Sequence, residues 1–242
     1  MKSNNLIRLY NKLRCMKEAT ISADIINSTS FDKDDTVMLS QYLTDFFVLL
    51  NSRFCDSWGR VVRGDGMEIV VPNVKDLVRI AVVLKCYIKA FKVNFGFFNN
   101  IRGHRRIPNF GIRVVIGIGG LRINDQKLGL IDGEAIYNSG RMLSIISSRM
   151  RDTLIVVGEE GIGLVWLQPM LSLIDEIISH ATAKQCDIMV RRFLGQTENQ
   201  IAQTIGISQA AVNTHLRRAG WHAISEAIDF YEDYFTKRKD LL

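Results

Sequence analysis

The chain has 242 residues, of which 47% are hydrophobic and 23% charged, and its formal net charge is +6 at pH 7. This composition is typical of a globular protein with a sizeable core, and it excludes extended disorder. A moderate positive charge is compatible with a nucleic-acid or nucleotide partner, although it does not require one.

The cysteines and the apolar segments indicate the compartment. Four cysteines lie far apart and form no CxxC or CxxxC pair, which argues against a disulfide scaffold and against a zinc site. Residues 1–17 carry charges throughout, so they do not read as a secretory signal peptide. The longest apolar stretch, 77–98, is interrupted by basic residues at the spacing of a soluble amphipathic helix. We therefore expect a cytoplasmic protein with free thiols and no membrane partner.

The two parts of the chain differ in pattern, because β-rich runs and helices alternate up to about Val157 and only helices follow Val165. In chain order, the pattern of the first part predicts a basic helix at 4–18, a strand at 19–25, a helix at 34–54, strands at 59–63 and 67–71, and a helix at 74–95. After a basic loop it predicts strands at 111–117 and 121–123, a helix at 133–148 and a strand at 153–157. Gly64-Asp65-Gly66 between the second and third strands is a strong hairpin signal.

This order of elements predicts the fold class. The order β-α-β-β-α-β is that of ferredoxin-like α+β domains, here with an extra strand and helix at the end. We expect the helices to pack on one face of the sheet. The prediction is an α+β domain over residues 1–160, followed by an all-α domain over 165–242.

Residues 197–219 predict a helix-turn-helix. Thr197 and Gln200 have the spacing of a capping box at the start of one helix, and Gly206 ends that helix where a positive φ is tolerated. Ser208 caps the second helix, whose Val212 returns to the core. The outward and capping positions of the second helix carry side chains that contact bases and phosphates, and we expect these to bind DNA: Ser208, Gln209, Ala210, Asn213, Thr214, Arg217 and Arg218.

This stretch resembles the helix-turn-helix of LuxR-type regulators and of the promoter-reading region of bacterial sigma factors. The resemblance covers about residues 180–220, with 182–194 as a preceding support helix, and it implies binding to double-stranded DNA. The alternative is a three-helix bundle used for protein contacts.

The first part contains residues that can handle phosphates. Asp24 ends the first strand and Asp65 lies at the hairpin tip, so the two carboxylates can meet and ligate Mg²⁺. The turn Asn27-Ser28-Thr29 offers backbone N–H groups to the same phosphates. Arg141 is a candidate catalytic residue that reaches the charge developing in phosphoryl transfer. The alternatives are an ordinary Asp-Gly turn, a locally bonded Asp24 and a solvated Arg141.

Four short segments in this part resemble the class III nucleotidyl cyclase core: 21–29, 63–66, 113–119 and 132–141. They resemble the SatD family more closely, because its members pair such a core with a terminal helix-turn-helix, and this likeness covers most of the chain. The resemblance implies Mg²⁺ or Mn²⁺ at Asp24 and Asp65, a nucleotide ligand and a homodimer.

The chain departs from the cyclase pattern where a cyclase reads the base. The positions of the base-reading lysine and aspartate hold Val61 and Leu130, and the position of the transition-state asparagine holds Tyr137. An apolar pair cannot hydrogen-bond an adenine edge, so ordinary adenylate cyclase activity is not expected.

We therefore expect a DNA-binding transcriptional regulator with a degenerate cyclase-like domain that senses a ligand or nucleotide. Two alternatives stay open: a metal-dependent nucleotidyl cyclase with altered base specificity, and a non-catalytic protein-interaction module.

Overall fold

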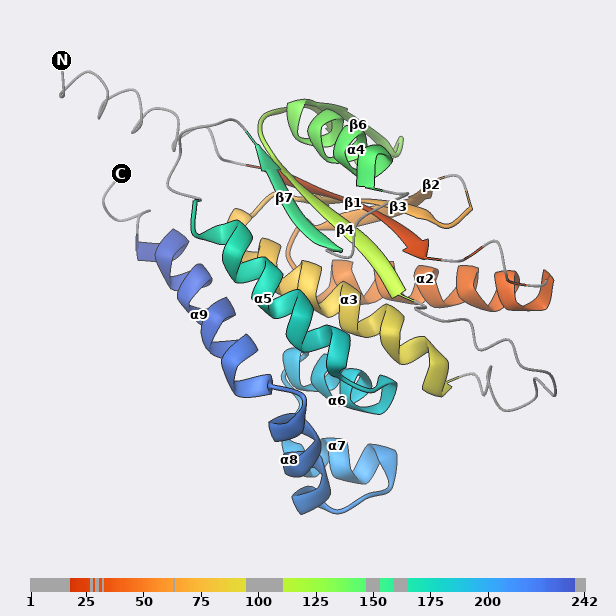
Figure 1. The fold of residues 1–242 in the computed structure, drawn as a ribbon. Coiled ribbons are helices and arrows are strands. Elements are labelled where there is room, and N and C mark those ends of the chain that lie inside the picture. Colours follow the sequence, from red (N-terminus) through yellow and green to blue (C-terminus); the bar gives the residue numbers. More distant parts are fainter. Residues whose placement is uncertain are drawn as a thin grey trace.

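The computed structural model describes residues 18–26, 28, 31, 33–62, 64–94, 111–146, 153–158 and 165–237. Over these residues the fold is mixed α+β, with a sheet in the N-terminal part and helices alone in the C-terminal part (Figure 1). Residues 4–17 of the predicted helix at 4–18, and the predicted basic loop, lie outside the described residues.

One mixed sheet of five strands organises the N-terminal part. Its strands are β1 (Ala19–Ile26), β2 (Trp58–Val62), β3 (Gly66–Val71), β4 (Gly111–Ile118) and β7 (Leu154–Gly158), in the order β2-β3-β1-β4-β7. The central β1 is antiparallel to β3 and β4, and β7 runs parallel to β4. A separate hairpin, β5 (Leu121–Asp125) with β6 (Leu130–Gly133), includes a strand that the sequence pattern did not predict.

Helices cover the sheet and form the C-terminal part. They are α2 (Lys33–Arg53), α3 (Leu77–Asn94) with the preceding short turn η2 (Val74–Asp76), α4 (Glu134–Ile146), α5 (Leu167–His180), α6 (Ala183–Phe193), α7 (Glu198–Ile205), α8 (Gln209–Arg218) and α9 (Trp221–Lys237). Among the described residues, no helix combines the length and apolar character needed to cross a membrane.

The sheet carries helices on both faces, which corrects the prediction that all helices share one face. Residues of β1 alternate, so that Ile21 packs in the core with α2 and α3, while its neighbour Ser22 faces α4. The Ser22 Oγ lies 2.7 Å from the Oγ of Ser139 on α4. Figure 1 shows α4 on one side of the sheet and α2 and α3 on the other.

A glycine in β4 allows α4 to approach the sheet closely. A Cβ atom at Gly117 would lie 2.1 Å from the carbonyl oxygen of Ala135, at the start of α4. The absence of a side chain at Gly117 therefore fixes where the helix rests on the sheet.

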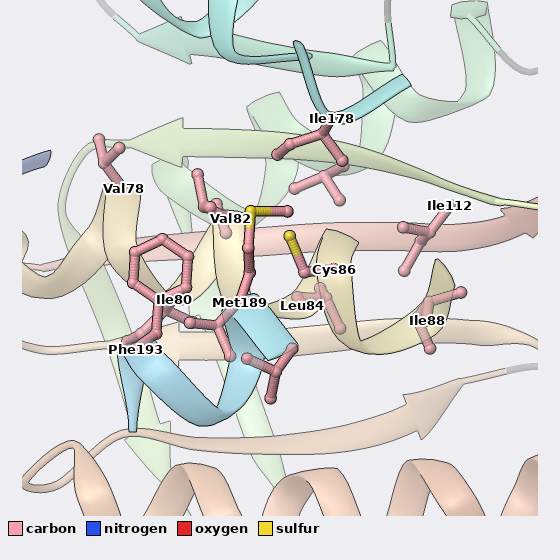
Figure 2. Close-up of a cluster of buried hydrophobic side chains, with 14 of the residues drawn as sticks. Val78, Ile80, Val82, Leu84, Cys86, Ile88, Ile112, Ile178, Met189 and Phe193 are labelled. Atoms are coloured by element: carbon pink, nitrogen blue, oxygen red, sulfur yellow. The ribbon is translucent and has the colours of Figure 1, made fainter. Parts of the chain in front are cut away.

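The core is continuous between the sheet and the C-terminal helices, because α3 lies between them. The sheet covers one side of α3 and the C-terminal helices cover the other, so Ile80, Leu84 and Cys86 are fully buried. Figure 2 shows these α3 side chains beside Met189 and Phe193 of α6. The predicted boundary at 160–165 falls almost entirely in 159–164, outside the described residues.

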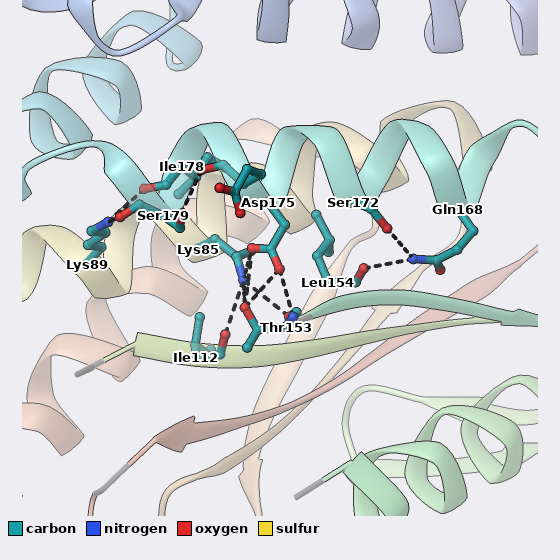
Figure 3. Close-up of polar contacts among 11 residues, drawn as sticks. Lys85, Lys89, Ile112, Thr153, Leu154, Gln168, Ser172, Asp175, Ile178 and Ser179 are labelled. Atoms are coloured by element: carbon teal, nitrogen blue, oxygen red, sulfur yellow. Dashed lines mark hydrogen bonds and ion pairs between the residues drawn. The ribbon is translucent and has the colours of Figure 1, made fainter. Parts of the chain in front are cut away.

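A buried polar cluster joins α3, α5 and the start of β7 (Figure 3). The Lys85 Nζ lies 2.6 Å from Asp175 Oδ1, and the backbone N–H of Thr153 donates to Asp175 Oδ2 at 2.7 Å. Burial lowers the pKa of Lys85, and the carboxylate of Asp175 opposes that shift. On the next turn of α3, the Lys89 ammonium donates to the carbonyl of Ile178 at 2.7 Å, near the end of α5.

Candidate functional site

The predicted caps of the helix-turn-helix are present. Thr197 and Gln200 form a reciprocal capping box at the start of α7. Gly206 ends α7 in the left-handed conformation, with φ 70° and ψ 37°. Ser208 caps α8 by accepting the backbone N–H of Ala211 at 3.2 Å. These local bonds set the angle at which α8 leaves α7.

An apolar stripe holds α8 against its neighbours. Val212 and Leu216, four residues apart, are buried, and Ala219 follows at the end of the helix. Ile201 and Ala202 of α7 are buried on the facing side. One face of α8 is therefore committed to packing on the other C-terminal helices.

The opposite face of α8 is open to solvent and basic at its end. The exposed residues on and just before the helix are Ser208, Gln209, Ala210, Asn213, Arg217 and Arg218. Thr214 is half-buried and its hydroxyl donates to the carbonyl of Ala210 at 2.9 Å. The helix itself carries no acidic residue. Figure 1 places α7 and α8 at the end of the molecule remote from the sheet.

An acidic residue that the sequence pattern did not single out contacts this face. The carboxylate of Glu198, the first residue of α7, accepts a hydrogen bond from the Gln209 Nε2, and its other oxygen accepts one from the Asn213 Nδ2 at 3.3 Å. The available signal was the spacing of the two amides, which places them on one side of α8.

The electrostatic environment of α8 is positive. Burial lowers the pKa of His215, and the neighbouring charges of Lys184 and Arg218 lower it further. His215 therefore stays neutral at a pH where an isolated histidine is already partly protonated.

The second candidate site lies at one end of the sheet, where Asp24, Asp65 and Ser28 come together. The register of β1 and β3 pairs Asp24 with Gly66, which brings the preceding Asp65 close. The Ser28 hydroxyl donates to the Asp65 Oδ2. Burial raises the pKa of Asp24, and the charge of Asp65 adds to that shift. The other two predicted turn residues, Asn27 and Thr29, lie outside the described residues.

Arg113, which the sequence analysis did not assign to this site, is paired with Asp24. The register of β1 and β4 places the two residues opposite each other, and the Arg113 Nη1 donates to Asp24 Oδ2 at 2.8 Å. The guanidinium partly opposes the rise in the pKa of Asp24. The other oxygen, Oδ1, is buried and has no hydrogen-bond partner within the described part of the chain. A charged residue in an otherwise apolar strand was the available sequence signal.

The donor set can be compared with the needs of Mg²⁺. That ion binds through one or two carboxylates together with water and substrate phosphates. Asp24 and Asp65 supply two carboxylates, and the described ranges contain no cluster of three or more His, Cys, Asp or Glu side chains suited to a metal. The residues therefore fit an ion shared with a phosphate ligand better than a metal site built from protein alone.

The candidate catalytic Arg141 lies elsewhere. It is exposed on α4 and lines an open pocket of about 720 Å³ with Arg122, Asp132 and Tyr137. The Arg122 Nε donates to the Asp132 Oδ2 at 2.5 Å, so one basic group of this pocket is already paired. Neither Asp24 nor Asp65 is among the described residues that line this pocket.

Comparison with protein-family models and with curated proteins finds no match to this chain. The assignment of function therefore rests on the chemistry and geometry of the residues described above.

Proposed function

We propose that this protein binds double-stranded DNA through α8 and regulates transcription. The observation that carries the proposal is the division of α8 into two faces: Val212 and Leu216 are buried, while Gln209, Asn213 and Arg217 are exposed. A helix held by one apolar stripe presents its polar face to the major groove of B-DNA, which is wide enough to admit it.

The residue types on the exposed face suit the parts of a duplex that they would meet. Amide side chains such as Gln209 and Asn213 read base edges, whereas Arg217 and Arg218 at the helix end neutralise phosphates. The first N–H groups of α8 next to Ser208 also favour a phosphate, because helix N-termini attract anions.

The test is duplex binding by the full chain as a function of salt. We expect the double variant Arg217→Ala/Arg218→Ala to bind every sequence more weakly and to reduce the slope of log K against log salt by about 2, or about 1 for each phosphate contact. The matched control, Arg53→Ala/Lys127→Ala, removes the same charge from exposed positions on α2 and in the turn between β5 and β6, and it keeps the full slope. A folded protein that binds no duplex at low salt contradicts the proposal.

A second candidate function is the binding of a phosphate-bearing nucleotide with Mg²⁺ or Mn²⁺ at the sheet. It is favoured by the convergence of Asp24, Asp65 and Ser28, and by the Asp24 Oδ1, which has no hydrogen-bond partner among the described residues. The element order β1-α2-β2-β3-α3-β4 and the strand order β2-β3-β1-β4 support a ferredoxin-like core. The position of Arg141 in a pocket that neither carboxylate lines among the described residues favours sensing over cyclase catalysis.

Calorimetric titration of the full chain with nucleoside triphosphates and Mn²⁺ tests this site. We expect Asp65→Asn to weaken nucleotide binding by at least about tenfold, because a divalent ion loses one of its carboxylate ligands. Asp45→Asn, at an exposed carboxylate on α2, is the control. Binding without release of pyrophosphate supports sensing, release supports the cyclase alternative, and the absence of binding removes the site.

We also propose that the regulator acts as a homodimer, an arrangement in which two copies of α8 read half-sites about 34 Å apart. Sedimentation equilibrium with and without DNA tests this stoichiometry, and one chain bound to one half-site contradicts it.

A further inference from the structure

Glu198 connects the two helices of the helix-turn-helix at the surface that the proposed function assigns to DNA. It is the first residue of α7, and each of its carboxylate oxygens accepts a hydrogen bond from an amide of α8, one from Gln209 and one from Asn213. The two amides are four residues apart, so one carboxylate reaches both. The glutamate is half-buried, and both amide residues are exposed.

The chemistry of a carboxylate determines how these amides are oriented. An ionised carboxylate accepts hydrogen bonds and cannot donate them, so the NH₂ group of each amide must face Glu198. An amide carries its oxygen and its nitrogen on opposite sides, so the carbonyl oxygen of each side chain is turned away from the glutamate. Each NH₂ group keeps one further hydrogen for another acceptor.

We propose that Glu198 is a positioning residue that gives α8 a preference for adenine, an inference that rests on the proposed DNA binding. Adenine offers its N6 amino group as donor and N7 as acceptor in the major groove, and an amide with a free oxygen and one free N–H matches both. Guanine presents two acceptors there, O6 and N7. An amide whose oxygen is held toward the base faces guanine with an unfavourable pair of acceptors.

Glu198 is also expected to weaken DNA binding, and this effect distinguishes the positioning role from simple attraction to DNA. Its negative charge at a DNA-facing surface repels phosphates, so neutralising it raises affinity for all sequences modestly. The substitution Glu198→Gln keeps the size of the side chain and can offer the amides either a donor or an acceptor. In this variant Gln209 and Asn213 are free to turn over, and discrimination between adenine and guanine falls.

The experiment selects bound sites for the full chain from a pool of random-sequence duplexes, and then measures affinity for selected duplexes in which single adenines are replaced by guanine. We expect Gln209→Ala and Asn213→Ala to identify the adenines that α8 reads. At those positions, Glu198→Gln should lower the ratio of adenine to guanine affinity at least about fivefold while overall affinity is kept or increased. Glu226→Gln, which removes the same charge from an exposed position on α9, should leave the ratio unchanged.

A triple variant separates positioning from direct contact. In the background Gln209→Ala/Asn213→Ala, Glu198→Gln should have no further effect on base preference. A remaining effect shows that Glu198 touches a base itself and overturns the inference, as does an unchanged ratio in the single variant. Both results leave DNA binding intact. The absence of any duplex binding by the folded wild-type chain instead overturns the proposed function and the inference with it.

Discussion

Lys85 is a buried lysine whose charge is balanced by a residue from a different part of the chain. Asp175 on α5 accepts from its ammonium, and the backbone of Thr153 donates to the same carboxylate. A buried pair of this kind adds little net stability compared with apolar residues of similar volume, but the loss of one partner leaves an uncompensated charge.

We expect Lys85→Met to lower the free energy of unfolding by about 3 kcal/mol, because Asp175 then stays buried without its cation. Urea unfolding followed by circular dichroism measures the change. Lys33→Met, at an exposed position on α2, serves as control and should alter the free energy by less than about 0.5 kcal/mol. A similarly small loss in Lys85→Met contradicts the ion pair.

His215 gives the stability of the molecule a dependence on pH. Burial and the charges of Lys184 and Arg218 hold its pKa below the ordinary value of 6.5. Between these two pKa values the unfolded chain binds more protons than the folded one, so the folded state loses stability as pH falls through this range. We expect the melting temperature to fall less between about pH 7.5 and about pH 5.5 in His215→Gln than in the wild type. His222→Gln, at an exposed position on α9, should match the wild type.

At the scale of elements, the contact between α4 and the sheet depends on Gly117. A methyl group there would meet the backbone of Ala135, which cannot move without the whole helix. We expect Gly117→Ala to lower the free energy of unfolding by about 3 kcal/mol. Gly140→Ala within α4 meets no atom of the described residues within 4 Å and should raise the free energy of unfolding by about 0.5–1 kcal/mol. Thermal unfolding of both variants checks the contrast, and equal effects would show that α4 does not rest on β4 here.

The sequence predicted those elements whose signals are local. Thr197, Gly206 and Ser208 specify helix ends through bonds within a few residues, so the helix-turn-helix could be predicted from spacing alone. The face of the sheet that α4 covers could not be predicted in this way. It depends on long-range contacts such as that between Ser22 and Ser139, which are more than one hundred positions apart in the sequence.

The site at the sheet likewise combines a feature that the sequence predicts with one that it does not. Proximity of Asp24 and Asp65 follows from a hairpin beside the first strand, which a β-α-β-β order suggests. The pairing of Arg113 with Asp24 depends on the register of β1 and β4, and a register shift of one residue would turn that arginine to the other face. Sequence spacing does not determine that register.

At the scale of the whole molecule, α6 and α9 of the C-terminal part are anchored on α3, the same helix that supports the sheet. Arg79 of α3 pairs with Glu232 of α9 at 2.5 Å, and the Tyr231 hydroxyl donates to the carbonyl of Val74 at 2.9 Å. Cys86 of α3 meets Cys186 of α6, and this contact together with burial raises the pKa of the Cys86 thiol. A ligand that displaces α3 would therefore act on α8 through a continuous set of packed side chains.

The shared core also determines what happens when the chain is divided. A fragment of residues 165–242 loses α3, so Met189 and Phe193 of α6, which are buried against that helix in the intact chain, become exposed to water. The Lys85 partner Asp175 is also left without its cation. We expect the fragment to keep helical far-ultraviolet circular dichroism but to lose the near-ultraviolet signal and cooperative thermal unfolding, while the full chain unfolds in a single transition. A fragment that melts cooperatively at the temperature of the full chain would show instead that α6 to α9 form a separate folding unit, and that α3 is a docking surface for it.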